Sequence, residues 1–129
     1  MTLKKKDLPN SLRMLYICGV FPDRSTLAHL EKLIDSGVTS VQLRIKEAAG
    51  TALYEAAVQY AGFCGKRNIP FFINDRFDVA LACGADGVHL GGNDLPVVAA
   101  RRIAPADFFI GATARDAATA KQAQADGAD

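Results

Sequence analysis

The sequence predicts an α/β fold in which parallel strands alternate with helices. Along its 129 residues, short apolar runs typical of buried strands alternate with longer segments whose apolar residues recur at helical spacing. Three of the predicted helices are followed by a glycine, at Gly37, Gly84 and Gly127, and at the first two a strand follows at once. Strands that alternate with helices pair in parallel through right-handed crossovers.

The predicted elements follow one another in five strand–helix units. Strands are expected over 12–20, 38–45, 71–73, 87–90 and 108–111, because most of these runs are continuously apolar at their starts, as in parallel strands buried on both faces. The first helix is expected over 25–36, with Ser25 as its N-cap, and the second over 51–66. A short third helix opens at Asp75 or Arg76 and ends near residue 83. The fourth spans 95–103 with Pro96 in its first turn. The last is capped by Thr113 or Asp116 and runs to about residue 126.

The glycine junctions favour a (β/α)8 barrel of the TIM-barrel type. They recur about every 45 residues, so one strand–helix unit takes about 22 residues and eight units need about 200. Residues 1–129 are therefore expected to form a single domain that holds the first five units of a barrel, truncated before strand six. The alternative is a complete doubly wound open sheet, although no GxGxxG motif follows the first strand to support a dinucleotide site.

Composition excludes two broad classes of partner. The 15 basic and 14 acidic residues leave a net charge of +1, which argues against an extended nucleic-acid surface. The longest clean apolar run, over 14–21, is far shorter than the roughly 20 residues of a membrane span. Polar residues and prolines interrupt the N-terminal region that follows the lysines at 4–6, so a secretory signal is rejected and a cytoplasmic protein is expected.

Polar side chains on the second predicted strand indicate an anion site. Alternation places Gln42, Arg44 and Lys46 on one face and the apolar residues 41, 43 and 45 on the other. Two cations pointing into a barrel mouth are costly unless an anion pairs with them, and a diphosphate suits the planar fork of arginine and the point charge of lysine. The alternative is that the two cations form internal ion pairs with acidic neighbours.

Two carboxylates follow the next strands. Asn74 and Asp75 end the third, and Asp94 follows the fourth after Gly91 and Gly92. Mg²⁺ is usually held by one or two carboxylates together with substrate phosphates and water. Taken singly, each aspartate could equally cap a helix; beside the cations of the second strand, a magnesium diphosphate site is favoured. Similarly, Thr113 could bind phosphate or cap a helix, and His89 is expected to be a hydrogen-bonded core histidine.

At these residues the chain resembles the thiamine-phosphate synthase family. The resemblance runs in order from about residue 15 to 129 and rests on QLRIK at 42–46, NDRFDVA at 74–80, GADGVHLG at 84–91 with DLP at 94–96, and IGAT at 110–113. It implies a transferase of thiamine biosynthesis with a (β/α)8 barrel. Such an enzyme joins hydroxymethylpyrimidine diphosphate to thiazole phosphate and releases diphosphate.

The resemblance also implies roles for individual residues. Asp75 and Asp94 correspond to the Mg²⁺ ligands, and Arg44 and Lys46 correspond to the catalytic residues that stabilise the charge of the departing diphosphate. The residues that correspond to the pyrimidine diphosphate site are Gln42, Leu43, Arg44, Ile45, Lys46, Asn74 and Thr113.

The chain departs from the family pattern in three places. Gly92 and Asn93 stand where Gln-Glu is common, and the later thiazole-phosphate loops and an active-site lysine would lie past Asp129, so little turnover is expected of this chain. Arg115 stands near a histidine that the similar thiazole tautomerases use, which favours the synthase over that alternative. A further alternative is a non-catalytic half-barrel that binds a phosphorylated ligand or a partner. Either way, an exposed sheet edge predicts a homo-oligomer or pairing with further strands.

Overall fold

The computed structural model describes residues 2–129 and confirms a parallel α/β fold built of five strands. Each strand pairs in parallel with the next in sequence order, so the order in the sheet is β1-β2-β3-β4-β5. A doubly wound sheet reverses its strand order at a switch point, whereas this sheet does not, so the arrangement is that of a barrel wall. The strands are β1 (Leu15–Cys18), β2 (Ser40–Leu43), β3 (Phe71–Asn74), β4 (Gly87–Leu90) and β5 (Phe109–Ala112).

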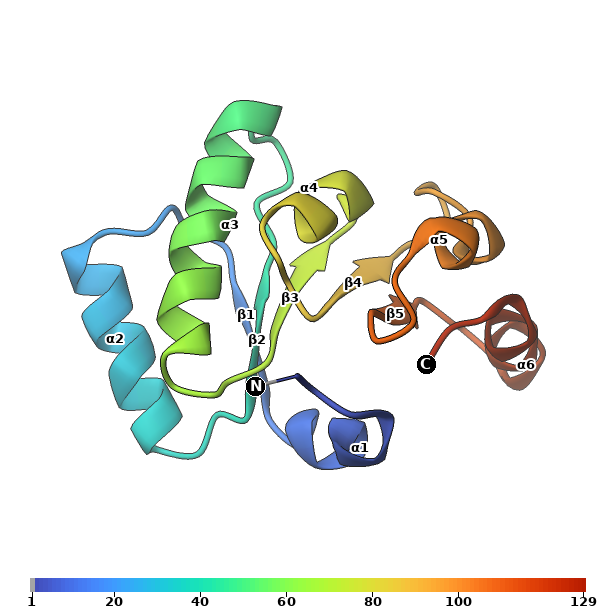
Figure 1. The fold of residues 1–129 in the computed structure, drawn as a ribbon, viewed down its shortest axis with the longest axis horizontal. Coiled ribbons are helices and arrows are strands. Elements are labelled where there is room, and N and C mark those ends of the chain that lie inside the picture. Colours follow the sequence, from blue (N-terminus) through green and yellow to red (C-terminus); the bar gives the residue numbers. More distant parts are fainter. Residues whose placement is uncertain (1) are drawn as a thin grey trace.

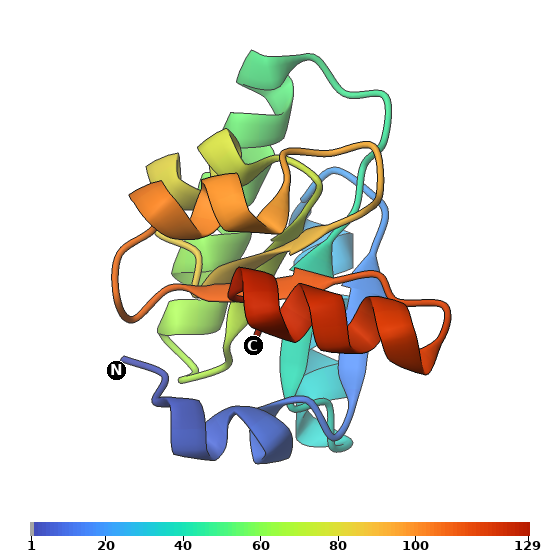
Figure 2. The ribbon, with the colours of Figure 1, turned by 90° about the vertical axis from the view of Figure 1, so that its right-hand side faces the viewer.

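The helices lie on both sides of this sheet in unequal numbers. The crossover helices arc around its outer side, whereas a short N-terminal helix lies on the inner side (Figures 1 and 2). The outer helices are α2 (Arg24–Asp35), α3 (Gly50–Gly65), α4 (Phe77–Ala82), α5 (Val97–Ile103) and α6 (Ala117–Asp126). The N-terminal segment forms the single turn η1 (Lys5–Asp7) and then α1 (Leu8–Ser11). No helix of the described residues is long and apolar enough to cross a membrane.

Strand alternation divides the buried residues into two clusters. The larger one lies between the sheet and the outer helices, and its strand residues are Cys18, Val41, Leu43, Phe71, Ile73, Val88, Leu90 and Ile110. The smaller one lies on the inner face, where Leu3 and Leu8 of the N-terminal segment pack on Phe72 and Phe109. Burial on both faces explains why the strand at residues 71–74 is continuously apolar at its start.

Glycines on the inner face make room for large side chains of the neighbouring strand. Gly87 is opposite Phe109 and Gly111 is opposite His89. A Cβ at Gly87 would clash with the carbonyl oxygen and Cβ of Phe109, and one at Gly111 would lie 3.0 Å from Nδ1 of His89. The inner face therefore holds an aromatic ring and an imidazole only because their partners lack side chains.

The glycine junctions share a hydrogen-bond pattern as well as a conformation. Gly37, Gly84 and Gly127 all have positive φ, at 120°, 72° and 110°, as the helix stops predicted. Two residues after each glycine, a side-chain oxygen accepts a hydrogen bond from an amide at or near the start of an odd-numbered strand. The pairs are Thr39 with Met14 at 2.9 Å, Asp86 with Phe71 at 2.8 Å and Asp129 with Ile110 at 3.1 Å. These contacts tie successive units together at the amino ends of the strands.

The N-caps of two helices can be compared with the predicted ones: the cap of α2 differs from the prediction, and the cap of α6 is one of the two predicted candidates. Ser25 is not the N-cap of α2; Asp23 is, because its carboxylate accepts from the Thr26 amide at 2.7 Å while the Thr26 hydroxyl accepts from the Asp23 amide at 2.7 Å. The same reciprocal pair, Asp116 with Thr119, starts α6. Asp116 rather than Thr113 is therefore the cap of the last helix.

Other boundaries also shift. The strand predicted over 12–20 is confined to β1, because residues 12–14 form a turn that follows α1, a helix that begins one residue before Pro9. Pro96 is the N-cap of α5 and not a residue of its first turn, so that helix starts at Val97 rather than at 95. The cysteines are all free; Cys18 and Cys64 are buried and Cys83 is half-buried.

Candidate active site

A cleft of about 560 Å³ lies at the carboxyl ends of the strands and is lined by every polar side chain predicted for the site. In parallel α/β folds this is the end where ligands bind. Strands β2 to β5 each contribute a residue at or just after their last position, since the chain leaves the sheet there, whereas β1 contributes Leu15 and Ile17. The predicted residues that line the cleft are Gln42, Arg44, Lys46, Asn74, Asp75, Asp94 and Thr113.

The alternation of β2 separates the polar from the apolar residues of the QLRIK segment. Gln42 is 6% exposed yet lines the cleft, and Arg44 and Lys46 follow it along the same side. Leu43 is 1% exposed in the outer core, and Ile45 packs against that core. Neither apolar residue lines the cleft, so of the five residues of this segment that were expected to bind substrate only three present their side chains to it.

Asp75 adopts a backbone conformation that is rare for residues other than glycine. Its φ is 67°, in the left-handed region, and its amide donates to the His89 carbonyl at 2.8 Å. Such conformations concentrate at functional sites, where the surrounding structure holds them. The N-cap of α4 is Arg76, which makes no capping hydrogen bond through its side chain, so Asp75 does not cap this helix.

Asp94 does not cap a helix either. The N-cap of α5 is Pro96, and the Asp94 Oδ2 accepts a hydrogen bond from the Gly91 amide at 2.7 Å. This bond closes the loop after β4 and holds the carboxylate at the cleft. A Cβ at Gly91 would lie 3.1 Å from Oδ2, so a side chain at that position would displace the carboxylate by a few tenths of an ångström. The capping alternative is therefore wrong for both aspartates.

The charges of the cleft influence one another without being paired. Burial raises the pKa of the Asp75 carboxyl above its ordinary value, and the neighbouring Asp94 carboxylate raises it further, whereas Lys46 and Arg44 act in the opposite direction. Among the ion pairs within residues 2–129, none involves these four residues. The alternative of internal ion pairs therefore finds no support, and the charges are available to a ligand.

The carboxylate pair suits a hard cation only in part. Within the described part of the chain no three or more His, Cys, Asp or Glu residues come together as a metal site. Asp75 and Asp94 could supply two oxygen ligands, and the remaining ligands would come from water and substrate phosphate, which is how Mg²⁺ is commonly bound. The donor set therefore fits Mg²⁺ that arrives with a phosphorylated ligand.

His89 is a cleft residue that the sequence analysis did not assign to the site. Its Nε2 lies 3.0 Å from Oγ1 of Thr113, so the expected hydrogen bond is present, but the half-buried ring also lines the cleft. Its inward position on β4, two residues before Gly91, was the signal that could have identified it. His29 lies on the exposed surface of α2.

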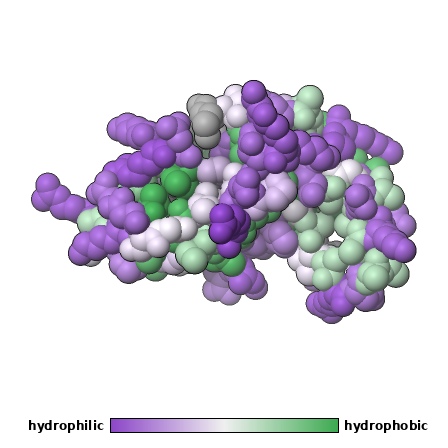
Figure 3. All heavy atoms as spheres, turned by 90° about the horizontal axis from the view of Figure 1, so that it is seen from below, coloured by the Kyte–Doolittle hydropathy of each residue, from purple (hydrophilic) through white to green (hydrophobic). Residues whose placement is uncertain are grey.

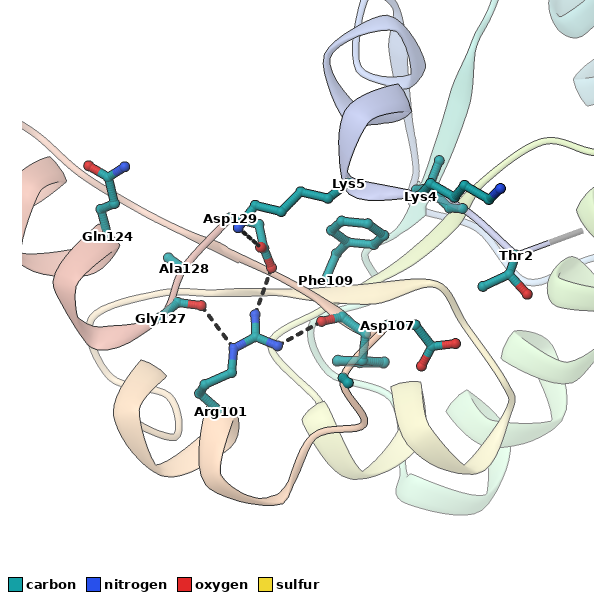
Figure 4. Close-up of a pocket in the computed structure, with 13 residues that line it drawn as sticks. Thr2, Lys4, Lys5, Arg101, Asp107, Phe109, Gln124, Gly127, Ala128 and Asp129 are labelled. Carbon is teal, nitrogen blue, oxygen red and sulfur yellow. Dashed lines mark hydrogen bonds and ion pairs between the residues drawn. The ribbon is translucent and has the colours of Figure 1, made fainter.

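A larger cleft, of about 690 Å³, lies at the amino ends of the strands beside the N-terminal segment (Figure 4). Its central cation is Arg101, which donates to the carbonyl oxygens of Gly127 at 2.9 Å and Phe108 at 2.8 Å and to Asp129 at 2.6 Å. Lys5 completes the cluster at 3.1 Å from Asp129. Hydrophilic side chains cover much of this face (Figure 3). Because Arg101 and Asp129 bind each other and the backbone, we assign this cleft to structure.

Known proteins resemble this chain over most of its length. The family model for thiamine monophosphate synthase matches residues 15–129. A thiamine-phosphate synthase of Coprothermobacter proteolyticus is 49% identical over 96 residues, which cover 74% of this chain and 46% of that protein. A probable thiamine biosynthetic bifunctional enzyme of Schizosaccharomyces pombe is 39% identical over 126 residues, which cover 97% of this chain and 24% of that protein.

The fold has a solved counterpart. Thiamine phosphate pyrophosphorylase from Pyrococcus furiosus superposes with a TM-score of 0.80 at 36% identity, covering 95% of this chain and 59% of that one. The chain spans about half the length of most of the curated relatives it matches.

Proposed function

The chain belongs to the thiamine monophosphate synthase family, and from that premise we propose that its cleft binds hydroxymethylpyrimidine diphosphate together with Mg²⁺. The reaction we propose for the whole protein is the coupling of this substrate with thiazole phosphate, a transferase step of thiamine biosynthesis. The thiazole tautomerase alternative is not favoured, since the relatives matched here carry the name of the synthase.

One observation carries the proposal: two cations and two carboxylates share a cleft without pairing. Arg44 and Lys46 offer a bidentate fork and a point charge to phosphate oxygens, while Asp75 and Asp94 offer ligands to a divalent cation. A magnesium diphosphate presents the complementary charges in one ligand. Arg44 and Lys46 are exposed, so their charges cost little without a ligand. Asp75 and Asp94 are half-buried, and two half-buried carboxylates without a cation would be unfavourable.

The proposed chemistry breaks one bond and forms one. The bond between the pyrimidine methylene carbon and the diphosphate oxygen breaks, and its electron pair leaves with the oxygen. The lone pair of the thiazole nitrogen then forms the new carbon–nitrogen bond, so the product carries a thiazolium charge. Arg44 and Lys46 would stabilise the negative charge that grows on the departing oxygen, and the bound Mg²⁺ would supply further charge neutralisation.

The neutral polar residues would orient the pyrimidine. Gln42 and Asn74 carry amides that can both donate and accept hydrogen bonds, which suits a ring with nitrogen acceptors and an amino donor. The Thr113 hydroxyl could donate to a phosphate oxygen, and His89 holds that hydroxyl at 3.0 Å from Nε2. These residues approach from different strands and would fix the ring and the diphosphate relative to each other.

We expect a cytoplasmic enzyme acting on small molecules, without nucleic-acid or membrane partners. The strands β1 and β5 are the edges of the sheet, and unpaired edges favour association with further strands or a second copy. Sedimentation velocity of the 129-residue chain tests this, because a stable monomer at micromolar concentration would contradict edge pairing.

Calorimetric titration with the pyrimidine diphosphate tests the proposed function directly. We expect binding that requires Mg²⁺ and that Asp75→Asn weakens by about 10–100-fold, the effect of losing one charge-assisted interaction. Asp78→Asn is the matched control, because Asp78 lies on α4 in an ion pair with Arg76 at 2.7 Å and does not line the cleft. No binding by the folded chain, or equal affinities for the two variants, would reject the proposed site.

A further inference from the structure

Arg115 is a third cation of the cleft that the proposed function leaves without a role. It lies between β5 and α6 and lines the cleft together with Arg44 and Lys46. Arg115 is exposed to solvent. Within residues 2–129 its guanidinium takes part in no ion pair, and the hydrogen bond it makes is through its backbone amide, to Oγ1 of Thr119 at 3.2 Å.

The acidic residue next to Arg115 is engaged elsewhere. Oδ1 of Asp116 accepts hydrogen bonds from the Thr119 amide and hydroxyl, both at 2.8 Å, and thereby caps α6. This capping box fixes the loop through the backbone and leaves the Arg115 side chain without a partner. The cation is thus held at the rim of the cleft by contacts that do not use its charge.

The charge balance of the cleft indicates that Arg115 can take part in binding an anion. Arg44 and Lys46 cancel Asp75 and Asp94, so these four residues alone leave no excess charge for an anion. A bound divalent cation would bring the site to an excess of about two positive charges, whereas an ionised diphosphate monoester carries about three negative ones. A third unpaired cation closes that difference.

We propose that Arg115 binds a phosphate group of the substrates and completes the anion site of the cleft. The inference rests on the proposed function and extends it to a residue outside the QLRIK and carboxylate motifs. Arginine suits this role because its planar fork donates two parallel hydrogen bonds to phosphate oxygens. The charge balance favours the diphosphate, although the monophosphate of the second substrate offers the same chemistry.

Titrations with inorganic diphosphate and with inorganic monophosphate, each with saturating Mg²⁺, test the inference. We expect Arg115→Gln to weaken diphosphate binding about 10–100-fold and to reduce its dependence on salt concentration. Arg115→Lys should recover part of the loss. Arg102→Gln is the control, because Arg102 is exposed in the last turn of α5 outside the cleft.

The outcomes separate this inference from the function on which it rests. If Arg44→Gln weakens diphosphate binding and Arg115→Gln matches the Arg102→Gln control for both anions, the inference is wrong and the proposed function stands. If unmodified protein binds neither anion, both fail. If Arg115→Gln weakens only the monophosphate, the residue is a phosphate ligand and the second substrate is the source.

Discussion

The left-handed conformation of Asp75 predicts that the fold becomes more stable when this residue is replaced by glycine. A φ of 67° costs an L-residue about 1–2 kcal/mol, a penalty that glycine does not carry. Glycine in turn makes the unfolded chain more flexible, which offsets about 0.5–1 kcal/mol of that gain. Within residues 2–129 the Asp75 carboxylate accepts no hydrogen bond from an amide or a basic side chain, so Asp75→Gly should stabilise the chain by about 0.5–1 kcal/mol.

Thermal unfolding and ligand titration of the same variant test this prediction. A gain of this size corresponds to an increase in Tm of about 2–4 °C for a domain of this length. The variant should at the same time lose Mg²⁺-dependent diphosphate binding, because one of its two carboxylates is gone. Stability and binding should therefore change in opposite directions.

Asn68→Gly is the matched control for the backbone effect. Asn68 has a φ of 55° in the turn after α3 and does not line the cleft. The Asn68→Gly substitution should raise Tm with no change in diphosphate affinity. A Tm of Asp75→Gly equal to or below that of the unmodified chain would show that the conformation stores no strain. Unchanged Mg²⁺-dependent binding by that variant would remove Asp75 from the site.

Three further predictions concern packing and pH. Tyr60→Phe should lower the free energy of unfolding by about 1–2 kcal/mol in urea titrations, because the buried hydroxyl donates to the Val20 carbonyl at 3.0 Å. Gly87→Ala should abolish the folded circular-dichroism spectrum, since its Cβ would clash with the backbone and Cβ of Phe109. The raised pKa of Asp75 predicts that Mg²⁺ affinity falls with decreasing pH at values above the ordinary 3.8. In that interval the folded state binds more protons than the unfolded state, so the Asp75 contribution to stability should improve as pH decreases, with Asp75→Asn as the control for both measurements.

Side-chain alternation explains how far the site could be predicted from the sequence. The two-residue alternation of a strand was sufficient to predict that Gln42 faces the cleft and Leu43 the outer core, because that rule depends on the strand alone. The choice between capping and ligand binding at Asp75 depends on the left-handed φ and on a helix that starts at Phe77. Neither property follows from residue type, so for this aspartate taken singly the two interpretations were equally consistent with the sequence, and only the neighbouring cations favoured ligand binding.

Long-range contacts account for the element that was missed. The helix α1 has four residues and Pro9 in its first turn, so its own sequence carries little helical signal. It is held by Leu8, which packs with Phe72 and Phe109 on the inner face of the sheet. By contrast, the error at Ser25 was local, since the Asp23 and Thr26 pair is a recognisable capping box.

Aspartates at the two ends of a parallel sheet meet different backbone groups. At the amino ends of strands, free amides point outward, and Asp86 and Asp129 accept hydrogen bonds from the amides of Phe71 and Ile110. At the carboxyl ends the free backbone groups are carbonyl oxygens, which cannot donate to a carboxylate. An aspartate there must find a loop amide or a cation, and Asp75 finds neither within the described residues. The geometry of the sheet thus leaves a carboxylate unsatisfied beside unpaired cations at the one end where a magnesium diphosphate would satisfy both.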